Sequence, residues 1–290
     1  MCKKLIQRAA ASTLLLVWPL LGMADPIVFS SGIEGGGYWS AATRLQAVAT
    51  DMGLEVQVEE SPGSLHNLAR LLDDGDPTSL VLAQADALQH YLNEHPGVSD
   101  NIEILENIGQ ECVFILTGGN SAIQTDKDLQ QGKGYKLAIG SPDSGVAVTY
   151  TYMTTLVPGL AGTSVLYTDT EAAVNGLNAA DSGEVDAVML VHRPKEYSPE
   201  VDLALRNPDQ FRFVRVTDER FKGELPGGEA VYRSLKLAIP VPDSEERREV
   251  ATICVKGLLV DNKEKLSPDQ RNTLVELVTV HWMEVYATDR

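Results

Sequence analysis

The sequence predicts an α/β protein built from two similar lobes with a ligand cleft between them. An apolar run at residues 27–29 leads through a glycine-rich turn into a segment whose apolar positions recur at helical spacing up to Met52. A second apolar run at residues 137–139 leads through the turn at residues 140–145 into another helix. The offsets between matching landmarks agree: Gly75 and Gly183, like Gln84 and His192, lie 108 residues apart (183 − 75; 192 − 84), and Gly36 and Gly145 lie 109 apart (145 − 36).

The turn between Ser31 and Tyr38 is expected to hold a ligand. Its four glycines let the backbone approach a bound molecule closely, and the helix that follows directs N–H groups and the positive end of its dipole towards it. These features favour an anion or a carboxylate. The alternative is that the glycines only make a tight turn.

The chain begins with the pattern of a secretory signal peptide. Lys3, Lys4 and Arg8 precede an apolar segment at residues 9–21, and small residues follow up to Ala24. We therefore expect residues 1–24 to be removed after Ala24 and the mature chain to be periplasmic. An uncleaved membrane anchor is the alternative.

The net charge bears on which partners the protein can bind, and the cysteines bear on whether it contains a disulfide. Loss of three basic residues with the signal peptide would change the net charge from −17 to −20 (−17 − 3), which disfavours nucleic acid as a partner. We expect a monomer. The mature chain would retain Cys112 and Cys254, which either form a disulfide or remain two buried thiols.

In the first lobe we expect a strand at Val56–Val58, a helix after residues 61–64, a buried strand at residues 80–83 and a further strand at residues 113–116. Gln84 stands at the carboxyl end of the strand at residues 80–83. The carboxyl ends of strands in such sheets face a crevice, so Gln84 is a candidate ligand contact. A solvated or helix-capping Gln84 is the alternative. The expected boundaries are residues 25–117 and 218–290 for the first lobe and 118–217 for the second.

In the second lobe we expect a helix at residues 172–177 and a strand at residues 185–191 that ends in His192 and Arg193. Strands are predicted at residues 211–216 and 233–239. The C-terminal part is predicted to be helical: residues 244–259, which include Cys254, and a last helix that opens at Ser267.

No catalytic motif is found in the sequence. It lacks a G-x-S-x-G turn, an H-E-x-x-H pair, a Walker loop and paired cysteines at zinc spacing. The five histidines show no metal-ligand spacing. We expect no enzyme activity, catalytic residue, metal or cofactor. A dinucleotide-binding enzyme with Glu59 or Glu60 as a ribose contact is a less favoured alternative.

Several motifs together resemble the TAXI class of extracytoplasmic solute-binding proteins, which serve TRAP transporters. They are S-G-I-E-G-G-G-Y-W from Ser31, E-E-S-P-G-S from Glu59, the strand ending in Gln84, G-S-P-D-S-G from Gly140 and G-E-V-D-A from Gly183. The resemblance covers nearly all of the mature chain. It implies a type II periplasmic-binding-protein fold whose lobes close around a small organic carboxylate or amino acid, and a TRAP-type permease as partner.

The sequence departs from this family in ways that bear on the solute. Glu34 brings a negative charge to the first turn, and Val146 replaces a hydroxyl after the second. Arg193 could clamp a carboxylate, and an amino acid with its ammonium near Glu34 is one candidate. A receptor that feeds a sensor is an alternative. The predicted ligand-binding residues are Ser31, Glu34, Gly35, Gly36, Tyr38, Ser61, Gly63, Ser64, Gln84, Ser141, Ser144, Gly145, Val146, His192 and Arg193.

Overall fold

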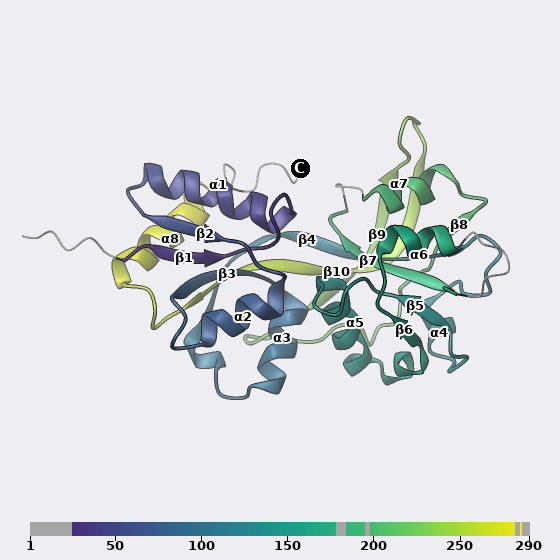
Figure 1. The fold of residues 1–290 in the computed structure, drawn as a ribbon, viewed down its shortest axis with the longest axis horizontal. Coiled ribbons are helices and arrows are strands. Elements are labelled where there is room, and N and C mark those ends of the chain that lie inside the picture. Colours follow the sequence, from purple (N-terminus) through teal and green to yellow (C-terminus); the bar gives the residue numbers. More distant parts are fainter. Residues whose placement is uncertain (1–24, 178–183, 195–197, 282–284, 286–290) are drawn as a thin grey trace, which may run out of the picture.

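The computed structural model describes residues 25–177, 184–194, 198–281 and 285. The predicted signal peptide lies outside the described residues, and so does Gly183 of the predicted repeat. Figure 1 shows two lobes side by side, joined by two long strands that run through both. Within the described ranges, no helix combines the length and the apolar character needed to cross a membrane.

The first lobe is a parallel sheet with helices on both faces. Its elements are β1 (Ile27–Ser30), α1 (Gly37–Asp51), β2 (Val56–Glu59), α2 (Ser64–Leu72), β3 (Thr78–Gln84), α3 (Ala85–Glu94) and the C-terminal α8 (Pro268–Val280). The strand order is β2-β1-β3. Leu80 and Leu82 of β3 pack in one buried cluster with α1 and α8, whereas Val81 and Ala83 pack in the other with α2 and α3. Both faces of β3 are thus covered, which explains its uninterrupted apolar sequence.

The second lobe repeats this plan. Its corresponding elements are β5 (Lys136–Ala138), α5 (Gly145–Leu156), β6 (Ser164–Leu166), α6 (Thr170–Leu177) and β7 (Ala187–His192), in the parallel order β6-β5-β7. The first residues of α1 and α5, Gly37 and Gly145, are 108 residues apart (145 − 37), as are the last residues of β3 and β7 (192 − 84). The predicted repeat is confirmed in the described elements, and the residue equivalent to Gly145 is Gly37 rather than Gly36. Shorter elements complete the chain: η1 (Ser99–Asn101), α4 (Asp126–Leu129), η2 (Pro158–Gly162), α7 (Pro199–Arg206) and β8 (Phe211–Phe213).

Two crossing strands, β4 (Ile102–Gly118) and β10 (Arg247–Asn262), connect the lobes. They pair antiparallel with each other; β10 also pairs with β3, and β4 with β7. The result is one sheet in the order β2-β1-β3-β10-β4-β7-β5-β6, with β9 (Tyr232–Pro240) paired to β10 and β8 to β4. Any movement of one lobe against the other must therefore bend these two strands.

The predicted helix at residues 244–259 is wrong, because β10 occupies most of this segment. Charged residues after Ser244 look like the first turn of a helix in the sequence. However, β10 lies in the interior of the sheet, and every residue from Thr252 to Asn262 except Lys256 is buried. A strand buried on both faces loses the alternation by which strands are recognised, so its apolar run can be mistaken for a helix.

Cys112 and Cys254 form a disulfide. They stand directly opposite each other in the β4–β10 ladder, with their Cα atoms 3.9 Å apart, and both are buried. Because Cys254 lies on β10 and not on a helix, the bond links the two crossing strands. Of the two alternatives left open by the sequence, the structure contains the bridge.

Candidate ligand-binding site

A cavity of about 380 Å³ lies between the lobes, where the turns before α1 and α5 meet the ends of β3 and β7. Its volume is in the range of small-molecule sites. Nine predicted residues line it: Gly36, Tyr38, Gly63, Ser64, Gln84, Ser141, Ser144, Gly145 and Val146. Six lining residues were not predicted: Gly32, Ile33, Gly37, Pro62, Glu111 and Val191.

Six predicted residues are not among those that line the cavity: Ser31, Glu34, Gly35, Ser61, His192 and Arg193. Glu34 is exposed, and its backbone N–H donates to Glu60 Oε1 at 3.1 Å. Gly35 has a φ of 80°, so it makes the tight turn itself, which favours the structural interpretation of this glycine. His192 stands opposite Cys112 in the β4–β7 ladder and therefore shares the face of the sheet that carries the disulfide.

Four of the five predicted serines, all except Ser141, make side-chain hydrogen bonds that hold the backbone around the cavity in place. Ser31 Oγ donates to a β2 carbonyl oxygen at 3.0 Å, and Ser61 Oγ to the carbonyl oxygen of Ser31 at 3.4 Å. Ser64 Oγ accepts from the backbone N–H of Gln84 at 3.1 Å. Ser144 caps α5 by accepting from a backbone N–H of its first turn at 3.2 Å. These hydroxyls already have protein partners, so they shape the site more than they offer contacts to a solute.

Asn67 is a structural residue that the sequence did not single out. It lies on the buried face of α2 and is fully buried. Its side-chain amide donates to the carbonyl oxygens of Ser31 and Leu82, at 2.6 and 2.7 Å, and accepts from Ser30 Oγ at 2.6 Å. It therefore fixes the ends of β1 and β3 beside the cavity. An amide among the apolar positions of a helix is the signal that could have revealed this role.

The two lobes touch each other around the cavity. A Cβ atom added to Gly145 would lie 2.5 Å from Gln84 Oε1, and one added to Gly63 would lie 3.2 Å from the carbonyl oxygen of Asp143. Gln84 is only 2% exposed, and its Oε1 has no hydrogen-bond partner. The structure thus represents a closed arrangement of the lobes.

A buried carboxylate outside the cavity lining joins both lobes. Asp86 at the start of α3 accepts hydrogen bonds from Thr149 Oγ1 of α5 at 2.6 Å and from the Tyr232 hydroxyl of β9 at 2.8 Å. Burial raises the pKa of Asp86, and these two donors oppose that rise.

Glu111 of β4 lines the cavity. The β4–β7 pairing sets Cys112 opposite His192, so the next residues, Glu111 and Arg193, are neighbours at the end of this ladder. Burial raises the pKa of Glu111 to about 7, although the positive charge of Arg193 opposes the rise. Burial, together with the charges of Glu111 and Asp86, raises the pKa of Tyr38 well above its usual value.

Arg193 also reaches the first lobe. Its guanidinium atoms lie 3.5 to 3.6 Å from the position that a Cβ on Gly37 would take, at the first residue of α1. No side chain caps α1, and its first turn contains no acidic residue. A guanidinium beside the positive end of a helix dipole creates a local field that favours an anion.

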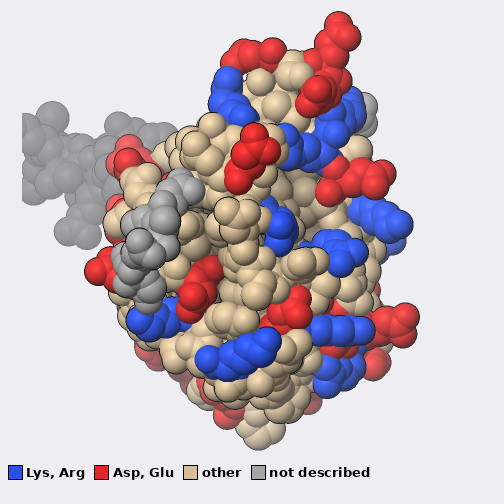
Figure 2. Space-filling model, turned by 90° about the vertical axis from the view of Figure 1, so that its right-hand side faces the viewer, with Lys and Arg blue, Asp and Glu red and all other residues tan. Residues whose placement is uncertain are grey.

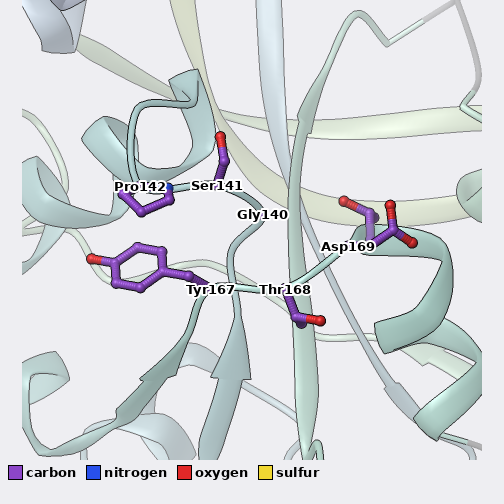
Figure 3. A pocket seen from close by; sticks show the side chains of 7 residues that line it. Gly140, Ser141, Pro142, Tyr167, Thr168 and Asp169 are labelled. Carbon is purple, nitrogen blue, oxygen red and sulfur yellow. The ribbon is translucent and has the colours of Figure 1, made fainter.

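An open groove adjoins the cavity at Ser141, which lines both. Figure 3 shows Pro142 and Tyr167 on one side of Gly140, and Thr168 and Asp169 on the other. Asp169 caps α6, because its Oδ1 accepts from the backbone N–H of Ala172 at 2.9 Å. The groove is therefore a polar extension of the cleft with one exposed aromatic ring.

The outer end of the second lobe has mixed charge. Figure 2 shows Lys and Arg interspersed with Asp and Glu on this face, without one broad basic patch. Such a surface does not have the continuous positive potential by which proteins bind nucleic acid. In the part of the chain that the structure describes, no cluster of three or more His, Cys, Asp or Glu residues could hold a metal ion.

Comparison with known proteins identifies the fold. No protein-family profile matches the chain, and no curated protein matches it. The chain is similar to XAC2383 from Xanthomonas citri bound to ATP, with a TM-score of 0.54 and 10% sequence identity over 91% of this chain and 89% of that one. It is also similar to a periplasmic transporter, with a TM-score of 0.50 and 12% identity over 90% and 84%. The chain has a mixed α/β fold like that of type II periplasmic binding proteins.

Proposed function

We propose that the protein is an extracytoplasmic solute-binding receptor that captures a small organic carboxylate, with an amino acid as one candidate, and delivers it to a TRAP-type permease. Binding makes and breaks no covalent bond. The receptor belongs to the TAXI class, is monomeric, and reaches the periplasm through a signal peptide removed after Ala24.

The observation that carries this proposal is the pair of equivalent turns across one cavity. Gly37 and Gly145 begin helices at the same position of the two repeats, and both line the cavity. Each helix directs its N-terminus towards the cleft, where N–H groups and the dipole favour an anion. Arg193 adds a full positive charge beside the first of them.

Other observations agree with this function. The crossing strands can act as a hinge, as expected of a receptor whose lobes close on a solute. The disulfide suits an oxidising compartment. The solved structure of XAC2383 holds ATP, itself an anionic ligand, on a similar fold.

The direct test is native mass spectrometry of the protein purified from its own host, followed by denaturation and identification of any released molecule. We expect an organic carboxylate or an amino acid. A released dinucleotide, or turnover of a substrate from a metabolite panel, would contradict the receptor function. The N-terminal residue of the purified protein should be Asp25.

Lobe closure has its own readout. Small-angle X-ray scattering should give a smaller radius of gyration with the released solute than without it, and an unchanged radius would count against the hinge. Deletion of the gene should abolish uptake of the labelled solute if a permease is the partner. Normal uptake, together with a lost transcriptional response, would favour a sensor instead.

A further inference from the structure

Glu111 is an acidic residue in a cleft that otherwise attracts anions. It extends from β4 into the cavity, at the level where both crossing strands pass between the lobes. A carboxylate solute held by the two helix N-termini would lie in the same cavity as this carboxylate. Two like charges that share one partly buried cavity repel each other unless one of them is neutralised.

The groups that face Glu111 come from several elements. Arg193 follows β7, Asp86 lies in the first turn of α3, and Tyr38 lies in the first turn of α1. The charges of Arg193 and Asp86 both act on Glu111. β10 places the uncharged Val255 directly opposite Glu111. Arg193 is therefore the cation that these elements bring to Glu111, and Asp86 adds a second negative charge.

The start of α5 and the end of β3 supply no further charge. Gly145 and Val146 of α5 and Gln84 of β3 line the same cavity. Lys256, the residue after Val255, is paired with Glu229. Within the described residues of these elements, the charges of Arg193 and Asp86 already act on Glu111 before any solute arrives, so an arriving anion adds further negative charge to this group.

Three of the polar side chains that line the cavity are already engaged with the protein or enclosed by it. Gln84 Oε1 is buried against Gly145, and the hydroxyls of Ser64 and Ser144 accept hydrogen bonds from backbone N–H groups. Glu34, the acidic residue of the first turn, is exposed and outside the cavity lining. A cation would depend on Glu111, which already has Arg193 beside it.

We propose that Glu111 selects the charge of the solute: the cleft takes up an organic carboxylate together with one proton from the solvent, and Glu111 holds that proton while the solute is bound. This inference rests on the proposed receptor function and specifies its solute class. Protonated Glu111 is neutral and can donate a hydrogen bond to the solute carboxylate, so the repulsion between the two carboxyl groups is removed. The pKa of Glu111, raised by burial to about 7, makes this protonation accessible near neutral pH.

The test uses acetate as the smallest carboxylate probe, titrated by NMR up to about 100 mM at pH 6 and pH 8. If only the form with protonated Glu111 binds, the affinity should fall about tenfold between these pH values. Glu111→Gln, a neutral mimic of the protonated acid, should bind acetate equally at both pH values and about tenfold more tightly than the wild type at pH 8. Glu34→Gln is the matched control and should keep the pH dependence of the wild type.

Calorimetry of the wild type keeps the proposal testable if Glu111→Gln does not fold. Titration of acetate in two pH 8 buffers of different ionisation enthalpy should show uptake of close to one proton. Release of a proton, or loss of affinity in Glu111→Gln at both pH values, would overturn the proposal. Absence of any saturable response at the amides of Gly37 and Gly145 would overturn it as well. A solute that binds without proton uptake would refute this inference alone, whereas failure to find any bound solute would refute the receptor function.

Discussion

Gly145→Ala should selectively destabilise the closed form of the protein. The added Cβ would lie 2.5 Å from Gln84 Oε1 and 3.2 Å from its Cδ, closer than real Cβ contacts come. Gln84 is 2% exposed and anchored through its backbone N–H to Ser64 Oγ, so it has little room to withdraw. Overpacking of this kind costs about 1 to 3 kcal/mol.

The lobes can escape the clash by opening, so the cost should appear in binding rather than in folding. We expect an affinity for the native solute that is about 5- to 150-fold weaker. The melting temperature without solute should fall by less than the loss of binding energy implies, because the lobes can open, although opening strains the Asp86–Thr149 hydrogen bond that joins them.

Gly176→Ala is the control, since it makes the same change in α6 of the same lobe, at a residue that does not line the cavity. Its Cβ would meet the Val185 side chain at 3.7 Å, an ordinary contact. Isothermal titration of both variants with the solute released from the native protein gives the comparison, and scattering gives the degree of closure. Equal affinities for the two variants, with Gly145→Ala fully closed, would refute the assignment of this contact to the closed form.

The remaining predictions concern stability. Replacement of both Cys112 and Cys254 by alanine should lower the free energy of unfolding by about 5 kcal/mol, because the bond joins residues 142 positions apart; unchanged denaturant midpoints would contradict this. Burial favours the neutral form of Asp76, but hydrogen bonds from Arg70 and Thr78 outweigh burial and hold the pKa of Asp76 well below its ordinary value near 3.8. Ionised Asp76 therefore stabilises the fold above pH 4, and this contribution is lost as the pH falls below that value. Asp76→Asn should lower the free energy of unfolding by roughly 1 to 2 kcal/mol at pH 7 and by progressively less in acid. A loss of stability that is the same in acid as at pH 7 would refute this role of Asp76. Thr149→Val removes a hydrogen bond to buried Asp86 and should lower the free energy of thermal or chemical unfolding by about 1 to 3 kcal/mol. The control Thr151→Val, on the exposed side of the same helix, should lower it by under about 0.5 kcal/mol. Equal losses in the two variants would argue against the inter-lobe contact.

The local features of the fold could be predicted from the sequence. Short apolar runs followed by glycine-rich turns identified β1 with α1 and β5 with α5, because strand, turn and helix signals are set by neighbouring residues. The repeat of about 108 residues identified two lobes of one plan. Nine of the fifteen predicted site residues line the cavity because they belong to those turns, to the turn between β2 and α2, or to the end of β3.

Tertiary structure decided the features that depend on distant segments. Residues 247–262 form a strand because β3, β4 and β9 pair with it, and a segment buried on both faces carries no periodic signal of its own. The same pairing brings Cys112 and Cys254 together across 142 residues. Glu111 enters the cleft because β4 passes between the lobes, while Glu34 turns to solvent although it lies in the first turn itself. Which carboxylate lines the cavity depends on strand register and lobe packing, and neither is encoded in the residues next to it in the chain.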